Sequence, residues 1–124
     1  MEPLILQETS LTPGISLNNE TGQLEFKGKS IPENSLDFYQ PIYEWLDAYV
    51  IEPNEKTIVT IQLDYFNTSS SKCILDILKR IDKLEITGYD VLIKWYYDEE
   101  DEDMMEAGED YSDLLEAPFE LLPM

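Results

Sequence analysis

Apolar and polar residues alternate in several short segments of the chain, and this pattern predicts β-strands with one buried face. Strands are expected in six segments: residues 4–7, 15–17, 23–29, 58–65, 90–97 and 119–122. Asn and Gly residues in segment 18–22 indicate a hairpin loop between the second and third strands. Residues 91–97 are apolar at nearly every position, which predicts a strand covered on both faces.

Two other segments show apolar residues at every third or fourth position, the pattern of amphipathic helices. Asn34 or Ser35 can cap the first, whose aromatic-rich stripe between Leu36 and Val50 is expected to lie in the core. Pro41 predicts a bend or a shortened first segment in this helix. The second helix is expected from about Ser69 to Leu84.

A third, shorter helix is expected within the acidic run 98–116, where Tyr111, Leu114 and Leu115 fit one helical face. Strand–helix–strand units imply right-handed crossovers and a parallel core sheet, to which the first hairpin adds antiparallel strands. The predicted fold is an α/β sandwich with helices packed against a mixed sheet of four or five strands. The chain length fits a single domain over residues 1–124.

The charge balance narrows the possible partners. Eight basic and 27 acidic side chains give a formal net charge of −19, which repels nucleic acids and anionic membrane surfaces. No apolar run approaches the ~20 residues needed to cross a bilayer, and the start of the chain lacks the basic region of a secretory signal. The expected location is therefore the cytoplasm. A basic protein partner remains open.

The residue types exclude several kinds of catalytic site. The sequence has no histidine, so Ser-His and Cys-His catalysis and nearly all zinc sites are excluded. Cys73, the single cysteine, lies on the apolar side of a predicted helix and is expected to be a buried thiol. No catalytic residue and no cofactor is therefore expected.

The acidic run 98–103 could suggest a metal site. A calcium loop needs oxygen ligands at alternate positions and Gly at the sixth. Counting from Asp103 puts Gly108 at the sixth position, but Met105 and Ala107 then occupy ligand positions. A solvated acidic face without metal is expected, and a small metal-dependent enzyme using carboxylates is kept as an alternative from another class.

Small polar residues, four of them hydroxylated, follow the central strand where the second helix begins: Asn67, Thr68, Ser69, Ser70 and Ser71. Such a junction lies at the carboxyl edge of the sheet, where open α/β folds place functional groups. An ordinary helix cap explains these residue types. A phosphorylation site also fits, because the helix start tolerates a phosphate while the surface gains about two negative charges. The chemistry of the residues favours the cap and does not distinguish among the hydroxyls.

Four motifs follow one another along the chain: Pro32-Glu33-Asn34-Ser35, Tyr65-Phe66-Asn67-Thr68-Ser69-Ser70-Ser71-Lys72, Trp95-Tyr96-Tyr97-Asp98 and Pro118-Phe119. With these motifs the sequence resembles the SiaC family of bacterial regulatory phosphoproteins over essentially the whole chain. The family is similar in fold to the STAS domains of anti-anti-sigma factors. The resemblance therefore implies a STAS-like α/β fold with an N-terminal antiparallel hairpin and parallel core strands.

The resemblance also implies a partner-switching protein that is not an enzyme. Its phospho-acceptor would be Thr68, phosphorylated by a serine/threonine kinase of the anti-sigma type and restored by a PP2C-type phosphatase. The unphosphorylated form would bind and activate a diguanylate cyclase, raising cyclic di-GMP and favouring biofilm formation or aggregation. Partner contacts are expected from the residues around the acceptor: Asn67, Ser69, Ser70 and Lys72. An alternative with the same fold and site is a STAS-type anti-anti-sigma factor that binds an anti-sigma kinase and regulates transcription.

Overall fold

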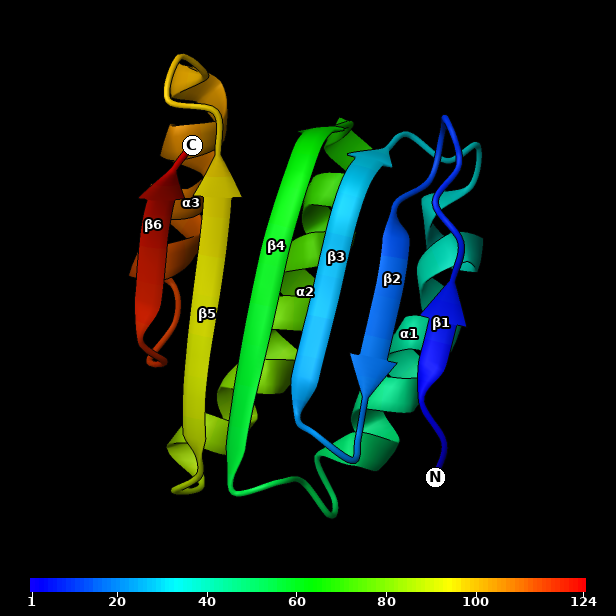
Figure 1. Ribbon diagram of the computed structural model, residues 1–124, viewed down its shortest axis with the longest axis vertical. Coiled ribbons are helices and arrows are strands. Elements are labelled where there is room, and N and C mark those ends of the chain that lie inside the picture. Colours follow the sequence, from blue (N-terminus) through cyan, green and yellow to red (C-terminus); the bar gives the residue numbers. More distant parts are fainter.

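A computed structural model describes all residues from Met1 to Met124. Nine elements follow one another: β1 (Leu4–Leu6), β2 (Gly14–Asn18), β3 (Gln23–Ser30), α1 (Ser35–Tyr49), β4 (Lys56–Phe66), α2 (Thr68–Ile86), β5 (Asp90–Tyr97), α3 (Glu102–Asp113) and β6 (Phe119–Pro123). The strands form one six-stranded sheet in sequence order (Figure 1). Strands β1 to β3 are antiparallel, and β3 to β6 are parallel.

This architecture confirms the predicted fold class, a mixed sheet with an antiparallel hairpin and parallel core strands. The prediction of four or five strands was wrong, because the segments at both ends of the chain pair as edge strands. Both edges are short: β1 has three residues, and β6 has five and ends at Pro123. None of the three helices is both long and apolar enough to span a membrane.

The three helices all cover one face of the sheet, which gives two layers (Figure 1). Strand β4 shows the consequence, because Val59, Ile61 and Leu63 are buried while the residues between them are half-exposed. The prediction that β5 is covered on both faces was wrong. Its buried positions also alternate, and Leu92 and Tyr96 lie half-exposed on the open face. These two residues are apolar without being buried, which made the segment look fully enclosed.

Helix α1 supplies much of the core through its aromatic stripe. Tyr39, Tyr43 and Tyr49 are buried in a hydrophobic core cluster of 26 residues, as the spacing predicted. Asn34 caps the helix, since its side chain accepts a hydrogen bond from the Asp37 N–H at 3.2 Å. The helix continues through Pro41 without interruption. One residue departs from the predicted stripe: Leu36 is 68% exposed.

Helix α3 packs closely on β5 and β6. Its inward side is formed by Met104, Gly108 and Tyr111. Leu114 follows the end of the helix and is exposed, so its predicted place on one helical face with Tyr111 was wrong. A Cβ atom at Gly108 would come within 2.7 Å of the Trp95 ring. The Trp95 indole N–H donates to the Met104 carbonyl at 3.0 Å. A glycine therefore sets the distance between this helix and the sheet.

Candidate functional site

The start of α2 is fixed by Asn67. This residue is extended and its N–H donates to the Ser30 carbonyl at 3.0 Å, which continues the β3–β4 pairing for one more residue. Its side-chain oxygen then accepts from the Ser70 N–H at 2.9 Å and satisfies one of the free donors of the first helical turn. Helix α2 consequently begins at Thr68, one residue before the predicted start.

The hydroxyl groups of this first turn are not equivalent. Thr68 is exposed, and no hydrogen bond involves its hydroxyl group. Ser69 donates to Asn67 Oδ1 at 3.1 Å and shares a 2.7 Å hydrogen bond with the hydroxyl of Ser35. Ser71 donates to the Thr68 carbonyl at 2.6 Å. Thr68 is thus the one hydroxyl of the four that is both exposed and free.

Ser70 belongs to a buried network instead. It is 0% exposed, and its hydroxyl donates to the Ser30 carbonyl at 3.0 Å while accepting from the Ser30 hydroxyl at 2.8 Å. The Tyr39 hydroxyl lies 2.6 Å from Ser30 Oγ. Burial raises the pKa of Tyr39 to about 12, against a lowering effect of the Ser30 hydrogen bond, so the group stays neutral at physiological pH. The network joins the end of β3 to the starts of both helices.

A groove of about 680 Å³ lies between the starts of α1 and α2. Its lining residues come from both helix starts: Glu33, Asn34, Ser35, Leu36, Thr68, Ser69, Lys72, Cys73 and Asp76. Thr68 and the exposed Leu36 both border this groove. Lys72 is exposed one turn after Thr68, with no carboxylate oxygen within salt-bridge distance. A negative charge added to Thr68 would therefore lie at the border of this groove.

The sequence-predicted site residues thus meet at one place, with different roles. Asn67 is the cap, Thr68 and Ser69 lie on the groove wall, Lys72 borders it, and Ser70 lies beneath the surface. Ser30, Ser35 and Tyr39 were not predicted as partners of this junction. Ser35 stands in the first resemblance motif and was recognised only as a possible cap. The other two carry no local signal, since their contacts depend on how β3, α1 and α2 pack.

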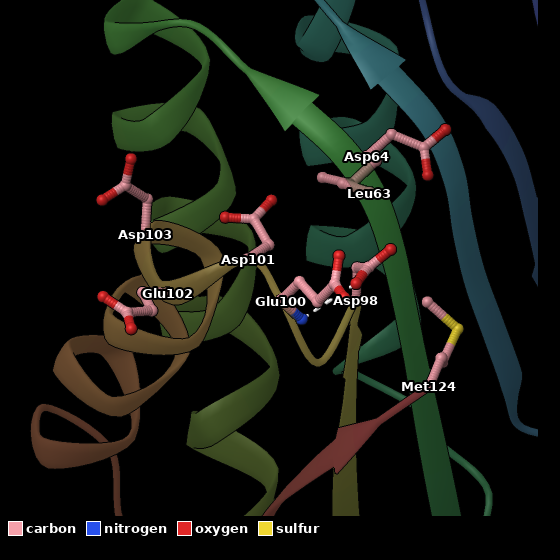
Figure 2. Close-up of a pocket in the computed structure, with 8 residues that line it drawn as sticks. All are labelled: Leu63, Asp64, Asp98, Glu100, Asp101, Glu102, Asp103 and Met124. Atoms are coloured by element: carbon pink, nitrogen blue, oxygen red, sulfur yellow. Dashed lines mark hydrogen bonds between the residues drawn. The ribbon is translucent and has the colours of Figure 1, made fainter.

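A second cleft, of about 650 Å³, opens at the same edge of the sheet (Figure 2). The β4–β5 pairing ends at Ile61 and Trp95, so the strands separate there. Six carboxylates line the cleft: Asp64, Asp98, Glu100, Asp101, Glu102 and Asp103. They come from β4, the loop after β5 and the start of α3, and Figure 2 shows them pointing in several directions. No group of three His, Cys, Asp or Glu side chains is placed to hold a metal ion.

Part of this acidic loop has a local structural role. Asp98 accepts a hydrogen bond from the Glu100 N–H at 2.9 Å, and Asp101 caps α3 by accepting from the Met104 N–H at 3.0 Å. The acidic residues at the beginning of α3 also suit the positive end of the helix dipole. Residues 98–103 are exposed apart from the half-buried Asp101, so the expectation of a solvated acidic face is confirmed.

Comparison with solved structures relates this fold to one group of proteins. Apo-SiaC from Pseudomonas aeruginosa matches with a TM-score of 0.91 and 28% identity, over 98% of this chain and 99% of that chain. A second structure of SiaC from the same organism matches with a TM-score of 0.92 and 27% identity, and all of both chains is covered. A third contains the diguanylate cyclase SiaD in complex with its activator SiaC, and matches with a TM-score of 0.91, 28% identity and the same coverage as the apo form.

The fold is therefore that of a SiaC-like α/β domain. In sequence, an uncharacterised protein of Pseudomonas aeruginosa strain UCBPP-PA14 is 29% identical over 119 residues, which is 96% of this chain and 94% of that protein. The model of the SiaC family of regulatory phosphoproteins matches residues 6–124. The chain belongs to the SiaC family.

Proposed function

We propose that this chain is a switchable activator of a diguanylate cyclase and that phosphorylation of Thr68 turns the activation off. A serine/threonine kinase of the anti-sigma type would add the phosphate, and a PP2C-type phosphatase would remove it. Membership of a family of regulatory phosphoproteins supports this proposal. The structural match to SiaC in its complex with the cyclase SiaD supports the choice of partner.

One observation carries the choice of Thr68 as acceptor: it alone among the hydroxyls of residues 68 to 71 is exposed and free of hydrogen bonds. A kinase must bring the attacking oxygen into line with the γ-phosphate, so an accessible hydroxyl is required. Ser70 would have to leave its buried network first. Ser69 would have to give up its bonds to Asn67 and Ser35.

The same position explains how the phosphate would act. Thr68 is the first residue of α2, so a phosphate there meets unpaired N–H groups and the positive end of the helix dipole, and the fold tolerates it. The groove wall meanwhile gains about two negative charges. A partner that covers the groove would have to bury this charge or place its own negative groups against it, at a cost of roughly 2–5 kcal/mol. Binding is then lost without any change of fold.

Phosphate mapping tests the acceptor. The purified chain is incubated with its cognate kinase and Mg-ATP, and intact mass and peptide mapping are expected to show one phosphate on Thr68. Thr68→Ala is expected to take none, while the matched control Ser69→Ala still takes one. Phosphate on Ser69 or Ser70 of the Thr68→Ala variant, at the wild-type rate, would show that the acceptor is wrongly assigned.

Partner binding tests the output. The unmodified chain is expected to bind the diguanylate cyclase of its own cell and raise the rate of cyclic di-GMP synthesis, and Thr68→Glu is expected to do neither. If Thr68→Glu binds and activates like the unmodified chain, the switch is wrong. If the chain does not bind the cyclase and binds an anti-sigma kinase alone, the function is that of an anti-anti-sigma factor.

A further inference from the structure

Basic residues are confined to few parts of this acidic protein. Four of the eight lie on α2: Lys72, Lys79, Arg80 and Lys83. The other four lie on the strands: Lys27, Lys29, Lys56 and Lys94. Helices α1 and α3 carry none. On the helical side of the molecule, α2 is therefore the only source of positive charge.

The three lysines of α2 form one line. Lys79 and Lys83 follow Lys72 by seven and eleven residues, spacings that bring side chains to the same face of a helix. All three are exposed, and none has a carboxylate oxygen within 4.0 Å. Asp76 is the one acidic residue on the same exposed face. We call Lys72, Lys79 and Lys83 the lysine stripe.

Arg80 is held differently and lies outside the stripe. Its guanidinium bonds to Asp47 of α1 at 3.0 Å and lies over the Tyr43 ring, 4.1 Å from the ring centroid. This arrangement fastens α2 to α1 and uses the charge within the protein. The lysines of the stripe, by contrast, remain available to another molecule.

Acidic helices border the stripe on both sides. Helix α2 lies between α1 and α3 (Figure 1). Helix α1 carries Asp37, Glu44 and Asp47, and α3 carries Glu102, Asp103, Glu106, Glu109, Asp110 and Asp113. A broad acidic surface would be repelled by these flanks, whereas a narrow acidic segment lying along α2 would meet three lysines and a single carboxylate, Asp76. The row of lysines between two acidic helices thus favours a partner segment that is both acidic and narrow.

We propose that the lysine stripe docks a single acidic segment of the cyclase, an inference that rests on the proposed function and names the chemistry of its partner surface. Thr68 lies at the beginning of the stripe, one turn before Lys72. With Asp76, the exposed face that bears the stripe has a net charge of +2 (3 − 1). A phosphate of about −2 on Thr68 cancels this charge, so phosphorylation removes the attraction as well as adding charge to the groove wall.

Charge-neutralising variants test the stripe, using the cyclase of the same cell as the probe. Lys79→Gln with Lys83→Gln leaves Thr68 and its groove unchanged. We expect this double variant to bind the cyclase about tenfold more weakly, mainly through a slower association rate, and to lose much of the salt dependence of wild-type binding. The matched control is Lys27→Gln with Lys94→Gln, which removes the same charge from the open sheet face and is expected to bind like wild type.

The outcomes separate the two proposals. If wild type binds, Thr68→Glu does not, and the stripe variant binds with wild-type affinity and salt dependence, the stripe is wrong and the proposed switch stands. If both double variants bind the cyclase equally weakly, net charge alone is responsible and the proposed role of the stripe is again wrong. If wild type does not bind the cyclase at all, the proposed function fails and the stripe assignment fails with it. Circular dichroism of each variant confirms that all are folded.

Discussion

The Tyr39 hydroxyl shows how single polar groups hold the start of α2 in place. It lies in the core with its hydroxyl 2.6 Å from Ser30, which in turn bonds Ser70 directly beneath the start of α2. Burial favours the neutral form of the phenol and so raises its pKa to about 12. Tyr111, whose hydroxyl donates to the Ser71 carbonyl at 3.0 Å, has a pKa raised to about 12 for the same reason. Two tyrosines thus fix adjacent parts of the first turns of α2.

The raised pKa of Tyr39 gives a prediction for stability at high pH. Below the unfolded-state pKa of about 10 the phenol is protonated in both states, so its contribution is fully present. Between pH 10 and about 12 the unfolded chain releases the proton first, so the free energy of unfolding falls. In Tyr39→Phe we expect this fall to be smaller by roughly 1–3 kcal/mol.

Urea unfolding at pH 9, 10, 11 and 12, followed by tryptophan fluorescence, measures this difference. At pH 9 the variant is expected to be about 1 kcal/mol less stable, because the hydrogen bond to Ser30 is lost. Tyr65→Phe, at an exposed position, is the matched control and is expected to follow wild type. Parallel curves for wild type and Tyr39→Phe above pH 10 would contradict the assignment.

At the scale of elements, helix α3 depends on a residue without a side chain. Gly108→Ala would place a methyl group within 2.7 Å of Leu121 and Trp95, atoms that belong to the sheet beneath the helix. Alanine favours helix by about 1 kcal/mol, but the crowding forces α3 away from β5 and β6. We expect a net loss of roughly 1–3 kcal/mol in the free energy of unfolding.

Thermal unfolding followed by circular dichroism checks this expectation. Ser112→Ala, which raises helix propensity in the same helix without replacing a close-contact glycine, is the control and is expected to be neutral or slightly stabilising. A Gly108→Ala variant more stable than wild type would mean that α3 does not lie as close to the sheet as described here.

Most elements could be predicted from sequence because their signals are local. Strand β5 was placed at residues 90–97 as observed, since Gly88 and the apolar run mark its limits. The prediction that β5 is covered on both faces was wrong because burial depends on which face the helices cover. The apolar side chain of Leu92 does not reveal that it lies on the open face. Leu114 was misplaced because α3 ends at Asp113, one residue earlier.

The candidate site likewise has features that the sequence predicts and features that depend on the packing of the fold. Asn67 as a helix cap follows from residue type and position, and the structure places it there. The difference between Thr68 and Ser70 does not follow, because it arises from bonds that Ser70 makes to residues 35 and 40 positions away in the chain. Residue chemistry therefore found the junction, and the packing of α1 and β3 against it distinguishes its hydroxyls.

At the scale of the whole molecule, added salt is expected to change the stability of the chain and its binding to the cyclase in opposite directions. A net charge of −19 on 124 residues makes the folded state repel itself, and salt screens this repulsion. Raising NaCl from 20 to 200 mM should therefore stabilise the free chain by roughly 0.5–1 kcal/mol, or about 2–5 °C in melting temperature. The same change should weaken cyclase binding through the lysine stripe.

Scanning calorimetry of the free chain over this salt range provides the test. Glu106→Gln with Glu109→Gln removes two exposed charges from α3 and is expected to melt higher at low salt, with a smaller salt effect. A melting temperature that is constant or falls as salt is added would show that self-repulsion is not a significant term.

The short edge strands have a consequence for how the protein behaves at high concentration. A sheet with one bare face and two free edges could recruit further chains edge to edge, as in the growth of fibres. Strand β1 offers only three residues for such pairing, and β6 carries Glu120 and ends at Pro123, which has no N–H to donate. The sheet thus leaves one face uncovered while its two edges remain poor templates for polymerisation.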